Sequence, residues 1–232
     1  MAKLGTVMNE RYPHWTSVGE RLRSLRKARG WTLQEVSART GIAVSTLSKA
    51  ERGQATLTYD RMVQLADGLA LDVAELFGRD LPQLTRGSIS LCRYGTAPLY
   101  ETLYYTYGMA NAEMAGKQMT PMFGTIRARS ITEFAELIRH PGEEFTIVLE
   151  GRVEVHIEGR KPQLLERHDT IYFDSSLGHA YVSVGPTEAL VMCICIGLRA
   201  GDDNAPAPPR GDRLTAASSA PVSIPATEGS SR

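Results

Sequence analysis

The stretch "WTLQEVSARTGIAVSTLSKAERG" (residues 31–53) decides the fold of the first part of the chain. Thr32 and Glu35 have the spacing of a capping box, which predicts the start of a helix. Gly41 ends this helix, because glycine adopts the required backbone turn at little cost. Another helix is predicted from about Val44 to Arg52. The stretch therefore predicts two short helices joined by a tight turn.

The apolar residues of the same stretch fit a helix-turn-helix. Ser37 is small where the two helices would cross, and the interior positions are filled by Val36, Ile42, Leu47 and Ala50. Periodicity predicts further helices outward from the stretch: one from Val18 to Gly30, one after Thr58 and a short one from Asp72. Five short helices predict a compact all-α domain.

With these motifs the sequence resembles the lambda-repressor-like helix-turn-helix domains of the XRE family. The resemblance spans Val18 to Phe77, and "STLSKAERG" (residues 45–53) is its most specific part. It implies that the helix after the turn enters the major groove of a double-stranded DNA operator. It also implies a homodimer on two half-sites, and we expect the later part of the chain to dimerise.

The residues facing outward on the predicted recognition helix are candidates for DNA contact. Lys49 can reach guanine and Val44 a thymine methyl group, whereas hydroxyl and amide groups suit phosphates. We expect base contacts from Val44, Ser45, Ser48 and Lys49, and phosphate contacts from Thr32, Gln34, Thr46, Arg52 and Gln54. The chain has no net charge, but residues 20–52 hold eight basic and three acidic side chains, a footprint typical of nucleic-acid binding.

After Phe77 the helical period gives way to short β-rich segments separated by turn residues. Their even spacing predicts an all-β sandwich or barrel. The expected strands lie in residues 88–94, 99–108, 122–129, 144–151, 152–159, 170–174, 179–185 and 189–198.

The whole chain of 232 residues is therefore divided into five parts. These are a leader (1–16), the helix-turn-helix domain (17–78), a linker (79–87), the β domain (88–198) and a tail (199–232). The tail is rich in Pro, Ala and Ser, and we expect it to be disordered because it has too little apolar surface to bury.

Two stretches of the β domain resemble the two motifs of the cupin family: "RHPGEEFTIVLEG" (residues 139–151) and "RHDTIYFDSSLGHAYVS" (residues 167–183). The resemblance implies a jelly-roll barrel, also called a double-stranded β-helix. It implies that His140, Glu144 and His179 occupy three of the four metal-ligand positions of the family. Ile138 shares a strand face with His140 and occupies the fourth, where it cannot bind a metal.

Three interpretations of this pocket remain open. His140, Glu144 and His179 hold a divalent metal, as a facial triad does. Alternatively, they hydrogen-bond a small polar molecule without a metal, or they are structural only. Ile138 makes the pocket more apolar and weakens a dication site, so we favour a metal-free pocket for a small-molecule effector. Tyr172 and Tyr181 are further candidates for its wall.

The remaining composition points to an intracellular protein. Cys92, Cys193 and Cys195 are interpreted as small buried apolar residues, because they form no Cys-x-x-Cys pair and have no histidine nearby in sequence. No apolar run approaches the roughly 18 residues of a membrane helix, and the N-terminus does not have the pattern of a signal peptide. We therefore expect a cytoplasmic protein with no membrane partner.

Together these features predict a transcriptional regulator, not an enzyme, with no catalytic residues. Its effector would modulate operator binding. Two alternatives stay open. One is a cupin metalloenzyme, a dioxygenase or isomerase, that carries a DNA-binding domain. The other is a repressor or antitoxin whose cupin domain only dimerises.

Overall fold

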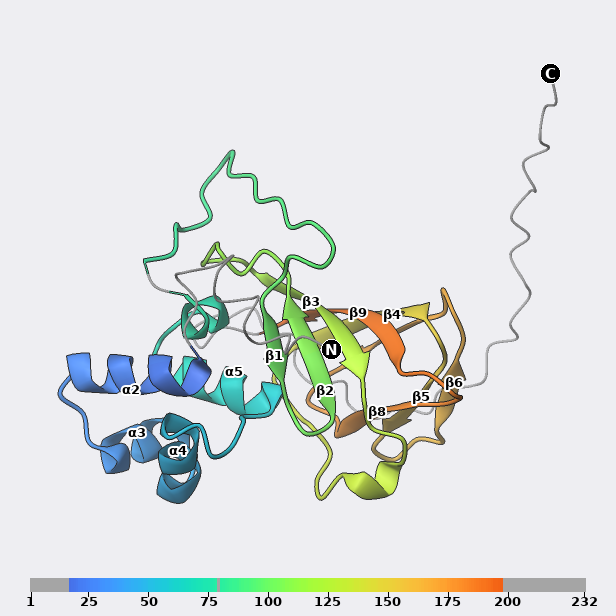
Figure 1. The fold of residues 1–232 in the computed structure, drawn as a ribbon, viewed down its shortest axis with the longest axis horizontal. Coiled ribbons are helices and arrows are strands. Elements are labelled where there is room, and N and C mark those ends of the chain that lie inside the picture. The colour runs from blue at the N-terminus through green and yellow to red at the C-terminus, as the bar shows by residue number, and fades with distance from the viewer. Residues whose placement is uncertain (1–16, 79, 198–232) are drawn as a thin grey trace, which may run out of the picture. The chain divides into compact units, whose positions relative to one another are not determined.

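The computed structural model describes residues 17–78 and 80–197 (Figure 1). The predicted leader (1–16) and tail (199–232) lie outside the described residues. Helices occupy the first part of the described chain and strands the rest. The predicted fold class, an all-α part followed by an all-β part, is confirmed. No helix in the described ranges is long and apolar enough to cross a membrane.

The helices follow the predicted caps closely. They are α2 (Val18–Ala28), α3 (Leu33–Thr40), α4 (Val44–Glu51) and α5 (Tyr59–Gly68). The capping box before α3 is present: the Glu35 amide donates to Thr32 Oγ1 (3.1 Å), and the Thr32 amide donates to Glu35 Oε2 (2.7 Å). Gly41 has a φ of 69°, the left-handed conformation that glycine adopts readily.

The predicted fifth helix is a single 3-10 turn, η1 (Val73–Leu76). Its capping box forms, because Asp72 and Glu75 bond to each other's backbone as expected. However, only four residues separate the N-cap Asp72 from the C-cap Phe77. Its amide hydrogen bonds from Glu75 to Asp72 and from Phe77 to Ala74 have the i→i+3 spacing of a 3-10 helix, so the prediction of five helices was wrong by one in residues 17–78.

The strands form two antiparallel sheets. The larger has the order β1-β2-β3-β9-β4-β7 and the smaller the order β6-β5-β8. The strands are β1 (Leu99–Glu101), β2 (Tyr105–Met109), β3 (Met119–Ile126), β4 (Glu143–Glu150), β5 (Val153–Ile157), β6 (Gln163–Leu165), β7 (Thr170–Asp174), β8 (His179–Ser183) and β9 (Ala189–Ile196). A 3-10 turn, η2 (Ile131–Glu133), lies between β3 and β4.

The strand predicted over residues 88–94 is absent. These residues have no strand structure, and Ile89 and Leu91 are 91% and 72% exposed. Alternation of apolar and polar residues makes a strand only where a neighbouring strand satisfies the backbone hydrogen bonds. Conversely, β6 was not predicted.

Strand register places the interior polar side chains. In the β4–β9 pair, Glu144 is opposite Cys195 and Thr146 is opposite Cys193. Residues directly opposite in an antiparallel pair point to the same face of the sheet. The carboxylate, the hydroxyl and both thiols therefore point into the space between the two sheets.

Side-chain contacts also join the helical part to the strands. The Tyr100 hydroxyl on β1 donates to the Leu57 carbonyl (2.9 Å) and accepts from the Leu57 amide (2.7 Å). The Gly116 amide donates to Asp72 Oδ2 (2.9 Å). Leu57 precedes α5 and Asp72 follows it, so both flanks of this helix are bonded to the β-rich part. Buried apolar residues of both parts form one continuous core.

Candidate functional site

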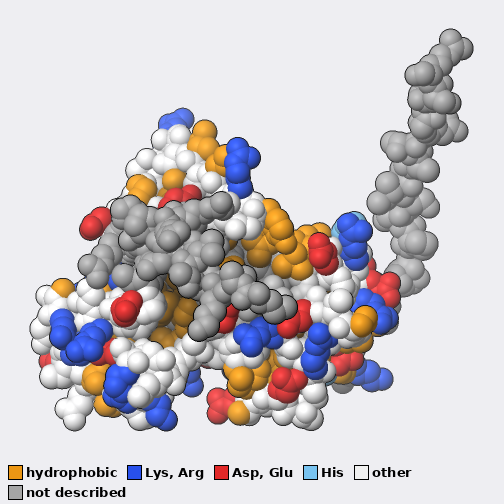
Figure 2. All heavy atoms as spheres, in the orientation of Figure 1, with side chains coloured by type: hydrophobic (Ala, Val, Ile, Leu, Met, Phe, Trp, Pro, Cys, Tyr) orange, Lys and Arg blue, Asp and Glu red, His pale blue; other side chains and the backbone are white. Residues whose placement is uncertain are grey.

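Helix α4 points its predicted DNA-contact residues outward. Val44, Ser45 and Lys49 are exposed, and Ser48 is half-buried. Leu47 is fully buried, so it anchors the helix. Figure 2 shows basic side chains on the surface of the helical part. The described geometry leaves this face of α4 available to a partner.

Most of the residues predicted to contact phosphates are exposed. Arg52 donates through Nε to Gln54 Oε1 (2.9 Å) and through Nη1 to the Ser48 hydroxyl. Thr32 and Gln34, at the start of α3, are exposed, and Thr46 is half-buried. The structure therefore brings Ser48, Arg52 and Gln54 into one polar cluster at the end of α4.

The start of α4 has no side-chain cap, since its N-cap residue is Ala43. Its first backbone N–H groups are therefore not satisfied by a capping side chain. A helix N-terminus with unsatisfied N–H groups attracts negatively charged groups such as phosphates.

The second site is the interior of the β-rich part. His140, Glu144, His179 and Tyr181 are all buried and line one cavity of about 30 Å³. Ile138 lines it as well, at the position where sequence analysis expected a missing ligand. A cavity of this size holds about one water molecule or one ion.

Tyr172 does not belong to this cavity. Its side chain is 62% exposed on β7, and its hydroxyl donates to Glu143. The neighbouring Phe173 is buried, because alternate residues of a strand point to opposite faces. The expectation that Tyr172 faces inward placed it on the wrong face of its strand.

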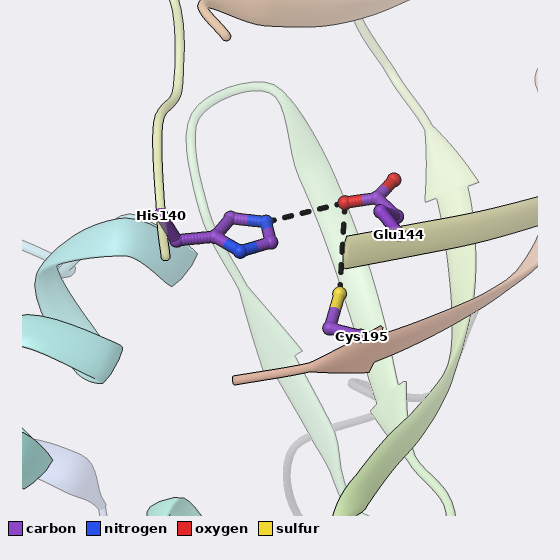
Figure 3. Close-up of side chains that lie close together, drawn as sticks. All are labelled: His140, Glu144 and Cys195. Carbon is purple, nitrogen blue, oxygen red and sulfur yellow. Dashed lines mark hydrogen bonds and ion pairs between the residues drawn. The ribbon is translucent and has the colours of Figure 1, made fainter. Parts of the chain in front are cut away.

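Glu144 is the centre of the buried polar cluster. Its Oε2 lies 3.2 Å from His140 Nε2, 3.6 Å from His179 Nε2 and 3.5 Å from Cys195 Sγ. Its Oε1 accepts hydrogen bonds from the Tyr181 hydroxyl and from Thr146 Oγ1 (3.1 Å). Figure 3 shows His140 and Cys195 pointing toward this carboxylate from the segment before β4 and from β9.

The electrostatics of this cluster favour an ionised carboxylate. Burial by itself raises the pKa of Glu144, but the hydrogen bond from His140 and the nearby imidazoles outweigh burial and lower this pKa to about 2. For His179, burial lowers the pKa, and the charge of Glu144 offsets only part of that effect. Glu144 is therefore negatively charged at neutral pH.

Sequence analysis missed several residues of this cavity. Cys193, Cys195, Tyr105 and Tyr107 line it, although the cysteines were interpreted only as apolar packing. That interpretation overlooked a histidine close in space, because His140 is distant from Cys195 in sequence. The two-residue spacing of the cysteines, which places them on one strand face, was the available signal.

Tyr59 is the least expected residue of the cavity wall. It is the first residue of α5, it is buried, and it lines the cavity beside Glu144. Its ring meets the His140 ring edge-on, with centroids 5.0 Å apart. Burial raises the pKa of Tyr59 well above its usual value, so its hydroxyl stays protonated. A residue of the helical part thus completes the wall of the interior cavity.

The donor atoms in the cavity fit a transition-metal ion. One donor atom each from His140, Glu144 and Cys195 lies within 4.8 Å of the others, and all three residues are buried. Imidazole, carboxylate and thiolate are ligands that zinc and related ions accept.

Comparisons with known proteins agree with both parts. The helix-turn-helix family profile matches residues 22–76, and the cupin domain profile matches residues 132–195. An HTH_3 family transcriptional regulator from Vibrio cholerae has a similar structure, with a TM-score of 0.52 and 21% identity over 79% of this chain and 96% of that one. Hydroxypropylphosphonic acid epoxidase from S. wedmorenis matches at a TM-score of 0.42 and 19% identity, over 79% and 98% of the two chains. None of the curated proteins compared with the sequence matches it.

Proposed function

We propose that this protein, which joins an XRE-type helix-turn-helix domain to a cupin domain, is a sequence-specific DNA-binding transcriptional regulator. The cupin domain binds a small effector in the cavity around Glu144, and the effector changes operator binding. The contact between Tyr59 and His140 is the observation that carries this proposal.

DNA binding is supported by the exposed face of α4. Lys49 and Ser45 are exposed there, and Leu47 holds the helix in its core. Such an arrangement suits a recognition helix that inserts into the major groove. Residues Ser48, Arg52 and Gln54 would lie along the adjoining phosphates.

Coupling between the two domains is supported by the position of Tyr59. An effector in this cavity of about 30 Å³ lies against its wall, and one that reorients His140 also shifts the Tyr59 ring that packs against it. A shift of Tyr59 moves the start of α5, and α5 packs against α3 of the helix-turn-helix. Effector binding then favours one arrangement of the DNA-binding helices over another.

The regulator acts as a homodimer. One helix-turn-helix reaches too few bases for high specificity, so two copies read two half-sites. The segment before β1 supports self-association, because Ile89, Leu91 and Tyr94 are large, apolar and exposed. Sedimentation of the full chain at micromolar concentration tests the dimer, and a monomer there would contradict it.

The competing function is a cupin metalloenzyme. The His140, Glu144 and Cys195 cluster suits a metal, which favours this alternative. An ion and an organic substrate together need a larger opening of the wall than an effector alone, because the cavity is about 30 Å³.

A two-step experiment tests the regulator. Duplexes that bind the full chain are first selected from a random pool, and the operator affinity is then measured by fluorescence anisotropy. Glu144→Gln removes a buried charge next to His140, whereas Glu158→Gln removes an exposed one that pairs with Arg139.

We expect Glu144→Gln to change the operator affinity several-fold and Glu158→Gln to leave it unchanged. Failure to select any duplex would overturn DNA binding. Equal affinities for both variants would overturn the coupling between cavity and recognition helix.

A further inference from the structure

Three donor groups converge on a single oxygen of Glu144. His140 Nε2, Cys195 Sγ and His179 Nε2 all lie between 3.2 and 3.6 Å from Oε2. Ligands around a four-coordinate zinc ion are separated by similar distances, because each ligand atom lies about 2.0–2.3 Å from the metal. The donor atoms of His140, Glu144 and Cys195 lie within 4.8 Å of one another, so small side-chain shifts would bring them around one ion.

The orientation of His179 points to a cation in the cavity. Its Nδ1 is 2.8 Å from the Leu177 carbonyl, which can only accept a hydrogen bond, so Nδ1 carries the proton. In a neutral ring the lone pair is then on Nε2, which faces the Glu144 carboxylate. Two acceptors facing each other repel unless a proton or a metal ion lies between them. An Nδ1–H bonded to a carbonyl also fixes the tautomer that metal-binding histidines use.

Charge balance supports a divalent ion. A dication buried among neutral groups is costly, and its cost falls when the ligands are negative. Glu144 supplies one negative charge and Cys195, once deprotonated, a second. The cavity of about 30 Å³ has room for one ion.

We propose that His140, Glu144 and Cys195 bind one thiophilic divalent metal ion, of which Zn²⁺ is the prototype, with His179 as the fourth ligand. Cys195 binds as a thiolate and releases its proton to solvent. This inference rests on the proposed function, since it names the metal ion as the effector of the regulator. The thiolate distinguishes the site from the histidine and glutamate set that sequence analysis considered.

Cobalt absorption spectroscopy tests the thiolate directly. Full-length protein is freed of metal with a chelator and titrated with Co²⁺, which replaces zinc and gives a thiolate charge-transfer band in the near ultraviolet. We expect saturation at about one Co²⁺ per chain with this band present. Competition with Zn²⁺ then gives the zinc affinity.

Two cysteine variants provide a matched pair. Cys193 is on the same strand face and lines the same cavity, but it accepts a hydrogen bond from Thr146 Oγ1 and does not belong to the group of donor atoms within 4.8 Å of one another. We expect Cys195→Ser to abolish the band and to weaken zinc binding by more than about 100-fold, the upper range for loss of an outer-shell partner. Cys193→Ser should keep both. A band that survives in Cys195→Ser, or no band in wild type, would overturn the proposal.

X-ray absorption fine structure at the zinc edge, measured on the wild-type protein, tests the same ligand if Cys195→Ser does not fold. One sulfur neighbour at about 2.3 Å is expected. A shell of nitrogen and oxygen only would refute the thiolate ligand.

The role of the ion as effector is measured separately, as operator affinity with Zn²⁺ and with chelator. An operator affinity that changes with Zn²⁺ supports the whole proposal. An unchanged affinity, in protein that shows the cobalt band, overturns the effector role while the ligand set stands. If no operator duplex can be selected at all, the proposed function fails, whereas the metal site is still tested by the cobalt titration.

Discussion

The recognition helix and the interior cavity hold their polar residues in opposite ways. On α4 the predicted base-contact residues Val44, Ser45 and Lys49 are exposed, and the Arg52 side chain bonds only to Ser48 and Gln54 among the described residues. In the cavity, Glu144 is buried and is bonded by His140, Tyr181 and Cys195 from three other segments and by Thr146 of its own strand. Exposed groups lose little when substituted, because water replaces their partners. Buried groups leave unsatisfied partners behind.

The largest expected effect is on stability, from Glu144→Ala. The variant leaves His140, Tyr181 and Thr146 without their shared acceptor, and loss of one member of a buried charged cluster costs about 3–5 kcal/mol. Denaturant unfolding in the presence of EDTA measures this cost without a metal contribution. Glu144→Gln keeps the side-chain volume and serves as the control, with a smaller loss expected.

The ionisation of Glu144 also predicts a pH dependence. Its pKa is about 2 in the folded protein, against an ordinary value of 4.5, so the folded state favours the charged form. The resulting stability is present above pH 4.5 and is lost as the pH falls toward 2. The difference in unfolding free energy between wild type and Glu144→Gln should shrink by about 2 kcal/mol from pH 5 to pH 3. A constant difference would mean that the pKa of Glu144 is the same in the folded and unfolded states.

On the exposed face of α4, Lys49→Ala should leave the stability of the fold unchanged and weaken operator binding by about 1–3 kcal/mol. It should also relax the base preference at one position of the site. Binding to the operator and to single-base variants, measured by anisotropy, checks both effects. Loss of stability in this variant would break the contrast between the two regions.

Arg52→Ala is the matched variant for phosphate contact. It should weaken binding evenly across sequences and reduce the salt dependence of log Kd by about 1. Salt titrations on operator and unrelated duplex measure this slope. If Arg52→Ala altered the base preference instead, the assignment of Arg52 to a phosphate contact would be wrong.

The smallest expected effect is a gain in stability. Ala43 is the N-cap of α4 and provides no side-chain hydrogen bond. Ala43→Ser adds one and should stabilise the protein by about 0.5–1 kcal/mol in thermal or denaturant unfolding. Ala38→Ser, inside α3, adds the same hydroxyl away from a helix start and should give no gain.

Local signals in the sequence predicted the helical part well. The capping box at Thr32 and Glu35 and the turn at Gly41 act within a few residues, so their outcome does not depend on distant contacts. The same is true of the buried face of α4. The fifth predicted helix starts after Asp72 as expected, but it is a 3-10 turn and not an α-helix.

Strand formation depends on pairing with a neighbouring strand, which the sequence indicates less directly than helix caps. Residues 88–94 alternate like a strand but have no partner, and Tyr172 points outward where an inward position was expected. The roles assigned to His140, Glu144 and His179 stay predictions, although all three are buried around one cavity. Cys195 reaches that cavity only because β9 pairs with β4 in the observed register.

The sequence by itself determined two domain types and the caps at Thr32, Gly41 and Asp72, and it predicted His140, Glu144 and His179 as pocket residues. These features arise from short-range spacing and periodicity. Only the tertiary structure placed Cys195 beside Glu144 and Tyr59 beside His140. Both contacts join segments that are far apart in the chain, and their geometry follows from strand register and from the packing of α5, which no local pattern specifies.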